Sequence, residues 1–122
     1  MSMSVYVGNI GAAPNQQYQL AIYTDSAGAP GTLVAASATG TLVANSWNTI
    51  AISASLQAST NYWLMFSTNG TTSSVNNMYY NSGSIGQGVY SNGSVTFGTW
   101  PATFPAATLT NGVFSLFATF GP

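Results

Sequence analysis

The most constraining feature of this sequence is an alternation of apolar and other residues with a period of two. It recurs in four runs, at 17–23, 48–53, 62–66 and 114–120. A period of two places every second side chain on one face of a β-strand, whereas a helix repeats near 3.6. No stretch combines helical periodicity with capping residues. The chain is therefore predicted to be all-β, with strands that each bury one face.

The alternation also predicts which side chains share a buried face. These sets are Tyr18, Leu20 and Ile22; Ile50 and Ile52; Tyr62, Leu64 and Phe66; and Phe114, Leu116, Ala118 and Phe120. Trp63 and Met65 are expected on the face opposite Leu64. Trp47, which opens a strand, is expected in the core because large aromatic side chains dominate protein cores.

Turn signals separate these runs. Asn-Gly pairs at 69–70, 92–93 and 111–112 are expected to form turns with positive φ. The five residues Gly-Thr-Leu-Val-Ala occur twice, at 31–35 and 40–44, which favours two similar neighbouring strands over a duplication. Several short strands at close spacing are typical of an antiparallel β-sandwich. A chain of 122 residues has the size of one domain.

A second constraint is the near absence of charge. Asp25 is the only charged side chain, and the sequence has no Lys, Arg, Glu, His or Cys. Without basic residues the chain cannot neutralise phosphates, so neither nucleic acid nor an anionic membrane surface is expected as a partner. No apolar run approaches the ~20 residues of a membrane helix, so no membrane insertion is expected.

The same residue inventory argues against catalysis. General acid–base chemistry needs a group with a tunable pKa, and glycosidases normally use two carboxylates. A serine triad needs a base such as His, and zinc sites need His, Cys or several carboxylates. We therefore predict that the chain is not an enzyme and holds no cofactor. Asp25 is a weak candidate for calcium, but the segment Thr24–Gly28 is more typical of a turn whose Asp accepts backbone N–H groups.

Aromatic residues supply most of the remaining binding chemistry. The flat faces of sugars stack on exposed aromatic rings, and Asn or Gln can bond their hydroxyls. The candidates for such a glycan platform are Trp63, Trp100, Tyr79, Tyr80 and Tyr90. Aromatic side chains also dominate protein cores and subunit contacts. The same five residues could therefore fill the core or form a subunit contact instead of binding sugar.

Two tripeptides match the acceptor pattern for N-glycosylation. They are Asn69-Gly70-Thr71 and Asn92-Gly93-Ser94. Both fall at predicted turns, where Asn69 and Asn92 would be exposed to modification. Glycans would add solubility to an almost uncharged surface.

The segment at 20–35 reads Leu-Ala-Ile-Tyr-Thr-Asp-Ser-Ala-Gly-Ala-Pro-Gly-Thr-Leu-Val-Ala. It resembles a jelly-roll-like β-sandwich domain found in many secreted bacterial proteins and surface proteins. The runs at 47–50 and 60–64 continue the resemblance, which covers residues 3–68 with a weaker match at the last strand. The resemblance implies a single jelly-roll-like β-sandwich over 1–122 and an extracellular or cell-surface location. Such domains serve in adhesion, carbohydrate binding or spacing, and the fold does not decide among these roles.

The resemblance also implies a missing strand. In relatives the run matching Met3–Val7 follows an earlier strand, whereas here the chain begins almost at that run. A sandwich without this strand exposes backbone groups and part of the core. Either the sequence is a piece of a longer chain that contains the strand, or a neighbouring subunit supplies it. Met3, Val5 and Val7 are the candidates for strand exchange.

These features lead to three functional hypotheses. The first is a non-catalytic extracellular structural subunit that self-associates by β-strand complementation into a homo-oligomer, filament or surface assembly. The second is a carbohydrate-binding or adhesion module of a larger secreted protein, with glycans as partners. The third is an inert spacer domain. The first is favoured because near-zero net charge removes repulsion between copies and leaves the strand edges without charged guards.

One prediction follows from the charge count alone. With a single carboxylate side chain, proton uptake hardly differs between the folded and unfolded chain below pH 8. We therefore expect the free energy of unfolding to stay nearly constant from about pH 2 to 8. Denaturant titrations across this range measure it, and a steep acid unfolding transition would contradict the prediction.

Overall fold

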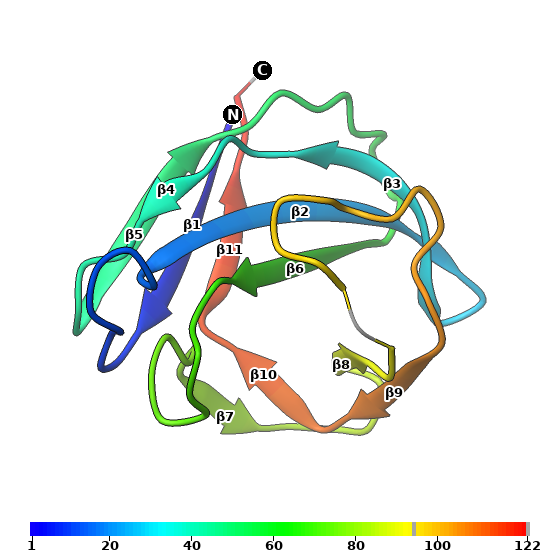
Figure 1. The fold of residues 1–122 in the computed structure, drawn as a ribbon. Helices are drawn as coiled ribbons and strands as arrows, with labels where there is room; N and C mark the ends of the chain where they lie inside the picture. Colours follow the sequence, from blue (N-terminus) through cyan, green and yellow to red (C-terminus); the bar gives the residue numbers. More distant parts are fainter. Residues whose placement is uncertain (94, 122) are drawn as a thin grey trace.

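The computed structural model describes residues 1–93 and 95–121 and confirms the all-β prediction (Figure 1). No described residue is helical. The strands are β1 (Ser2–Val7), β2 (Gln17–Ser26), β3 (Ala29–Ala36), β4 (Gly40–Thr41), β5 (Ser46–Ala51), β6 (Tyr62–Thr68), β7 (Tyr80–Ser82), β8 (Gly88–Ser91), β9 (Ala107–Thr110), β10 (Gly112–Phe114) and β11 (Leu116–Thr119).

Two antiparallel sheets pack against each other as a β-sandwich. The first sheet has the order β11–β1–β5. In the second sheet β2 is central, with β6 along one edge and β3 and β4 following one another along the other. The first copy of Gly-Thr-Leu-Val-Ala lies within β3, whereas only Gly40 and Thr41 of the second copy form a strand, β4. Two short ribbons, β7–β10 and β8–β9, lie across the opening below β6 (Figure 1).

The main core lies between the two sheets. Its buried members are Met3, Val5, Val7, Tyr18, Leu20, Ile22, Leu42 and Ile52. The faces predicted from alternation are confirmed for β2, for Ile50 and Ile52, and for Tyr62, Leu64 and Phe66, which pack against this core. Every second residue of β1 and β2 therefore points into the sandwich.

A second, smaller core covers the opposite face of the second sheet. Its buried members are Ala21, Tyr23 and Met65, and the partly buried Leu33, Trp63, Val89, Trp100 and Phe104 pack against them. The Tyr23 ring lies edge-on to Phe104 at 5.1 Å, and its hydroxyl donates a 2.6 Å hydrogen bond to the Pro101 carbonyl. Because β2 is covered on both faces, all six residues from Tyr18 to Tyr23 are buried.

The turn between β2 and β3 follows the sequence prediction. Ala27 and Gly28 connect paired residues Ser26 and Ala29, and both have positive φ, 52° and 88°. Two successive residues with positive φ form a type I′ turn, which suits a two-residue hairpin. Asp25 Oδ2 accepts the Gly28 N–H at 3.3 Å. The turn interpretation of this segment is confirmed.

Two local predictions are wrong. Among the described residues, positive φ occurs at Ala27, Gly28, Asn45, Ser59, Asn76, Gly86 and Gly98, and at none of the three Asn-Gly pairs. The alternation at 114–120 is also broken, because Phe114 ends β10 and only Leu116 and Ala118 pack on the main core from β11. Phe120 lies beyond β11 and is 70% exposed.

Amide side chains hold the loops at the end of β6. The buried Asn76 side chain accepts the Gly11 N–H at 2.9 Å and donates to the Asn15 carbonyl and to Thr68 Oγ1, both at 2.8 Å. Asn76 thus joins the loop after β1 to the end of β6. Because the chain has one charged side chain, neutral hydrogen bonds stabilise these loops in place of ion pairs.

The buried phenols predict an alkaline limit to stability. Burial raises the pKa of Tyr18 and Tyr23 above the usual value of 10.0, because the charged phenolate is disfavoured away from water. Above pH 10 the unfolded chain then holds fewer protons than the folded chain, so the free energy of unfolding falls as pH rises. Denaturant titrations from about pH 8 to 11 should show this fall. It should be shallower in Tyr18→Phe, and an unchanged slope in that variant would contradict the prediction.

Candidate functional site

The edge of the second sheet that borders the lower ribbons is formed by β6. Among the described residues β6 pairs with β2 alone, along the register Tyr18↔Thr68 to Thr24↔Tyr62. No described strand lies on the other side of β6. An unpaired strand edge presents a row of N–H and C=O groups that can pair with another strand.

The hydrogen-bonding pattern of β2 shows which groups β6 presents. The Leu20 N–H donates to Ser37 Oγ at 3.0 Å and its carbonyl accepts the Ser37 N–H at 2.8 Å, so the Leu20 backbone faces away from β6. In an antiparallel ladder neighbouring residues point their backbone groups to opposite sides. The odd-numbered residues of β2 therefore bond to β6, as in the pair Ala21↔Met65.

It follows that the intervening residues of β6 direct their backbone groups outward. Tyr62, Leu64 and Phe66 are among them. Their side chains pack against the main core, so each of these residues combines a core contact with backbone groups that face away from β2. The edge is continuous, uncharged and free of Pro.

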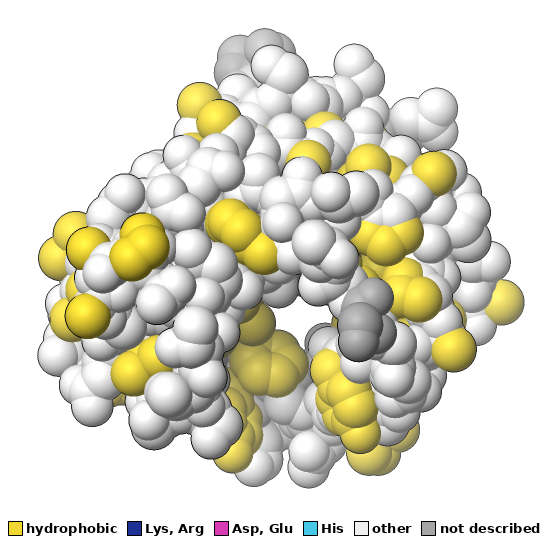
Figure 2. All heavy atoms as spheres, viewed as in Figure 1, with side chains coloured by type: hydrophobic (Ala, Val, Ile, Leu, Met, Phe, Trp, Pro, Cys, Tyr) yellow, Lys and Arg dark blue, Asp and Glu magenta, His cyan; other side chains and the backbone are white. Residues whose placement is uncertain are grey.

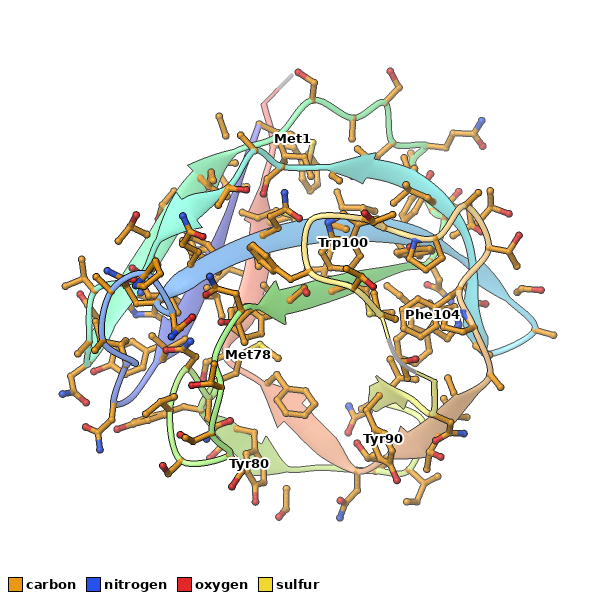
Figure 3. The ribbon with its side chains drawn as sticks, in the orientation of Figure 1. Met1, Met78, Tyr80, Tyr90, Trp100 and Phe104 are labelled. Atoms are coloured by element: carbon orange, nitrogen blue, oxygen red, sulfur yellow. The ribbon has the colours of Figure 1, made fainter. Side chains whose placement is uncertain are left out.

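An open apolar cavity of about 470 Å³ lies against this edge. Its wall combines β6 with side chains from the ribbons and loops below, including Met78, Val89, Val113, Phe114 and Trp100. Figure 2 shows the hollow on the face toward the viewer, with hydrophobic side chains in its wall. In Figure 3 the labelled Met78, Tyr90, Trp100 and Phe104 surround the same opening. The edge and the cavity together form the candidate site.

The two predicted tryptophan candidates belong to the second core. The Trp63 ring packs on the face opposite Leu64, as expected, and its Nε1 donates to Asp25 Oδ1 at 2.8 Å. Trp100 lies 6.3 Å from the Tyr23 ring, and its buried Nε1 has no partner among the described residues. Both side chains are partly buried and line the cavity.

The three tyrosine candidates do not share one surface. Tyr79, Tyr80 and Tyr90 are 51%, 65% and 56% exposed. Tyr80 contacts the Phe114 ring at 5.8 Å, and Tyr90 lies at the rim of the cavity. Tyr79 instead packs against Tyr6 on the outer face of the first sheet.

The strand-exchange candidates lie inside the first sheet. Met3, Val5 and Val7 are fully buried in β1, which pairs with β5 on one side and β11 on the other. Donation of β1 to a neighbour would therefore open the first sheet of the donor.

The two predicted glycosylation sites differ in their surroundings. The Asn69 amide is engaged: Oδ1 accepts the Gln17 N–H at 2.9 Å, and Nδ2 donates to the Pro14 carbonyl at 2.8 Å. A glycan on Asn69 would have to break the bonds of Nδ2. Asn92 is exposed and its Oδ1 accepts from Thr108 Oγ1 at 2.6 Å. Ser94 of that tripeptide lies outside the described residues.

The prediction that Trp47 is a core residue is wrong. Trp47 is 51% exposed on the outer face of β5, where it meets Tyr6 and Phe117. The alternation in the sequence already indicates that Trp47 points outward. Position 47 is odd, whereas the inward-facing Ile50 and Ile52 are even, and Tyr6 and Phe117 likewise alternate with inward-facing neighbours.

Comparison with known proteins finds no matching family model, no similar curated protein and no similar solved structure. The described residues include no helix long and apolar enough to cross a membrane.

The surroundings of Asp25 predict the response to calcium. Both carboxylate oxygens already accept hydrogen bonds, from Trp63 Nε1 and the Gly28 N–H, and a single carboxylate makes a weak site. We expect millimolar calcium to leave the thermal unfolding midpoint unchanged, and Asp25→Asn to lower stability by about 1 kcal/mol. Differential scanning calorimetry measures both. A midpoint raised by calcium and not by magnesium would contradict the expectation.

Proposed function

We propose that this chain is a non-catalytic structural subunit that self-associates by accepting a strand from a second copy at the free edge of β6. The observation that carries the proposal is the unpaired, uncharged edge bordering an open apolar cavity. Strand addition combines backbone hydrogen bonds at such an edge with side-chain contacts in adjacent pockets.

The site offers apolar contacts on both faces of an incoming strand. A strand beside β6 would continue the second sheet, so its side chains would alternate between the two faces of that sheet. One face meets Leu64, Phe66 and Leu116, and the other meets Met65 and Val89. A strand with apolar residues on both faces would thus fill the cavity and complete both cores.

The charge inventory supports association. Natural sheets protect their edges with Lys, inward-pointing charges or Pro, and the β6 edge has none of these. A formal net charge of −1 provides little repulsion between copies. Because donor and acceptor are different surfaces, the contact is heterologous and can propagate into a filament. An extracellular or cell-surface assembly, with glycans on its exposed turns, is part of this proposal.

The donor can be distinguished by how assembly begins. If β1 with Met3, Val5 and Val7 is donated, it must first leave the sheet in which both its edges are paired. Assembly would then require partial unfolding and would be slow in native buffer. A donor outside the first sheet would assemble on mixing native copies.

The test replaces one outward-facing backbone donor. Leu64→Pro removes an N–H that faces away from β2, a position where an edge strand tolerates Pro. Leu64→Ala removes the same side-chain contacts and keeps the N–H. We expect light scattering and electron microscopy to show assemblies for the wild type and weaker association for Leu64→Ala, which loses a side-chain contact with the added strand. Association of Leu64→Pro should be weaker than that of Leu64→Ala by at least about tenfold.

A second pair of variants separates the cavity from general charge effects. Val113→Glu places a carboxylate at the cavity wall, whereas Val43→Glu places one on an exposed site elsewhere. Both lower the net charge by one unit, so only Val113→Glu should block assembly. A wild type that stays monomeric at high concentration, or two variants with equal effects, would overturn the proposal.

A further inference from the structure

Four aromatic side chains gather on the outer face of the first sheet. We call them the outer aromatic cluster: Tyr6 of β1, Trp47 of β5, Phe117 of β11, and Tyr79, which precedes β7. Tyr6 contacts Trp47 and Tyr79 with ring centroids 5.5 and 4.9 Å apart, and Trp47 contacts Phe117 at 5.1 Å. Trp47, Tyr79 and Phe117 remain 51%, 51% and 45% exposed. A contiguous exposed apolar patch of this kind typically marks a binding surface.

The backbone holds this cluster in place. Tyr6 pairs with Trp47 across β1 and β5. The Tyr79 N–H donates to the Tyr6 carbonyl at 3.1 Å, and the Ser115 N–H donates to the Tyr79 carbonyl at 2.8 Å. A Cβ on Gly8 would lie 2.9 Å from the Tyr79 ring, so this glycine leaves the room that the ring needs. The rings therefore stand on a hydrogen-bonded sheet and not on a free loop.

The polar groups beside the cluster are hydroxyls. Thr49 and Thr119 lie two residues beyond Trp47 and Phe117 on the same strands, hence on the same face, and both are exposed. Ser4 Oγ and Thr49 Oγ1 are 2.8 Å apart. The only carboxylate side chain, Asp25, lies at the far end of β2 in the other sheet, bonded to Trp63. The surface thus combines aromatic rings with neutral hydroxyl groups.

We propose that the outer aromatic cluster binds a neutral glycan. A neutral sugar presents apolar C–H faces that stack on aromatic rings and hydroxyls that bond to Thr and Tyr hydroxyls. Sugars that carry carboxylate, sulfate or phosphate find no cation here, because the chain has no Lys or Arg. An ionic sugar would lose hydration at this surface without gaining an ion pair, so the proposed ligand is an uncharged carbohydrate.

The relative orientation of the rings indicates which physical form of carbohydrate the cluster can bind. The ring planes are inclined by 77° between Tyr6 and Trp47, 54° between Tyr6 and Tyr79, and 67° between Trp47 and Phe117. Rings without a common plane cannot all lie on a flat crystalline polysaccharide surface. The cluster therefore binds a single soluble glycan chain in preference to an insoluble crystalline face.

This inference does not depend on strand addition at β6. The cluster lies on the first sheet, whereas the β6 edge belongs to the second sheet. A chain that binds glycan and stays monomeric would support glycan binding at the cluster and overturn the proposed self-association. A chain that self-associates and binds no glycan would support self-association and overturn glycan binding.

The test is calorimetric titration of the full chain with soluble neutral polysaccharides: a β-glucan, a galactomannan and a xylan. Alginate serves as the anionic control and crystalline cellulose as the flat one. We expect binding to at least one neutral polymer, none to alginate, and weaker retention on cellulose. Trp47→Ala and Tyr79→Ala should each weaken binding at least about fivefold. Tyr80→Ala, an exposed neighbour outside the cluster, should change it less than about twofold.

Tryptophan fluorescence provides a readout that does not depend on heat of binding. A sugar stacked on Trp47 should shield it from acrylamide quenching, and Trp47→Phe should remove that protection. Circular dichroism of each variant verifies the fold. Absence of binding to all neutral polymers, or binding that Trp47→Ala and Tyr79→Ala leave intact, would overturn the inference. Loss of self-association in these variants without any glycan binding would also overturn it, and would make the cluster a contact between copies.

Discussion

The fold depends on the burial of β2 on both faces. Its even-numbered side chains, such as Leu20 and Ile22, complete the core between the sheets, and its odd-numbered ones, such as Tyr23, anchor the second core. The same strand carries β6 on one edge and β3 with β4 on the other. Because β2 fixes the position of β6, it also determines that the outer edge of β6 faces the cavity.

An almost uncharged chain has to stabilise its loops and limit its partners by other means. Amide side chains replace ion pairs, as Asn76 does by joining three segments, and Asn48 does by bonding the backbone of Val43 and Ser46. Amide side chains do not provide the charge repulsion that, in other proteins, keeps the edge strands of two copies from pairing. The absence of charge is thus compatible with a stable fold and at the same time leaves the β6 edge without charged side chains.

The β6 edge and the outer aromatic cluster occupy different sheets, so both can be occupied at once. Strand addition at β6 would leave the outer face of the first sheet exposed in every subunit. A filament would then repeat the same weak glycan site at regular spacing, and multivalency would raise the apparent affinity without new contacts. The two proposals together describe an assembly that adheres through many identical surfaces.

The alternation in the sequence determined the strands β2, β5 and β6 and which of their side chains face inward, because a period of two is a local property of an extended backbone. The alternation also places Trp47 on the outward face of its strand. The prediction of a core position was wrong because it relied on the general preference of tryptophan for protein cores. Only the tertiary structure decided that β6 is an edge strand, that Phe120 lies outside the core, and that Tyr79 joins Tyr6. These depend on which distant strands pair, and pairing is settled by long-range packing that no local pattern encodes.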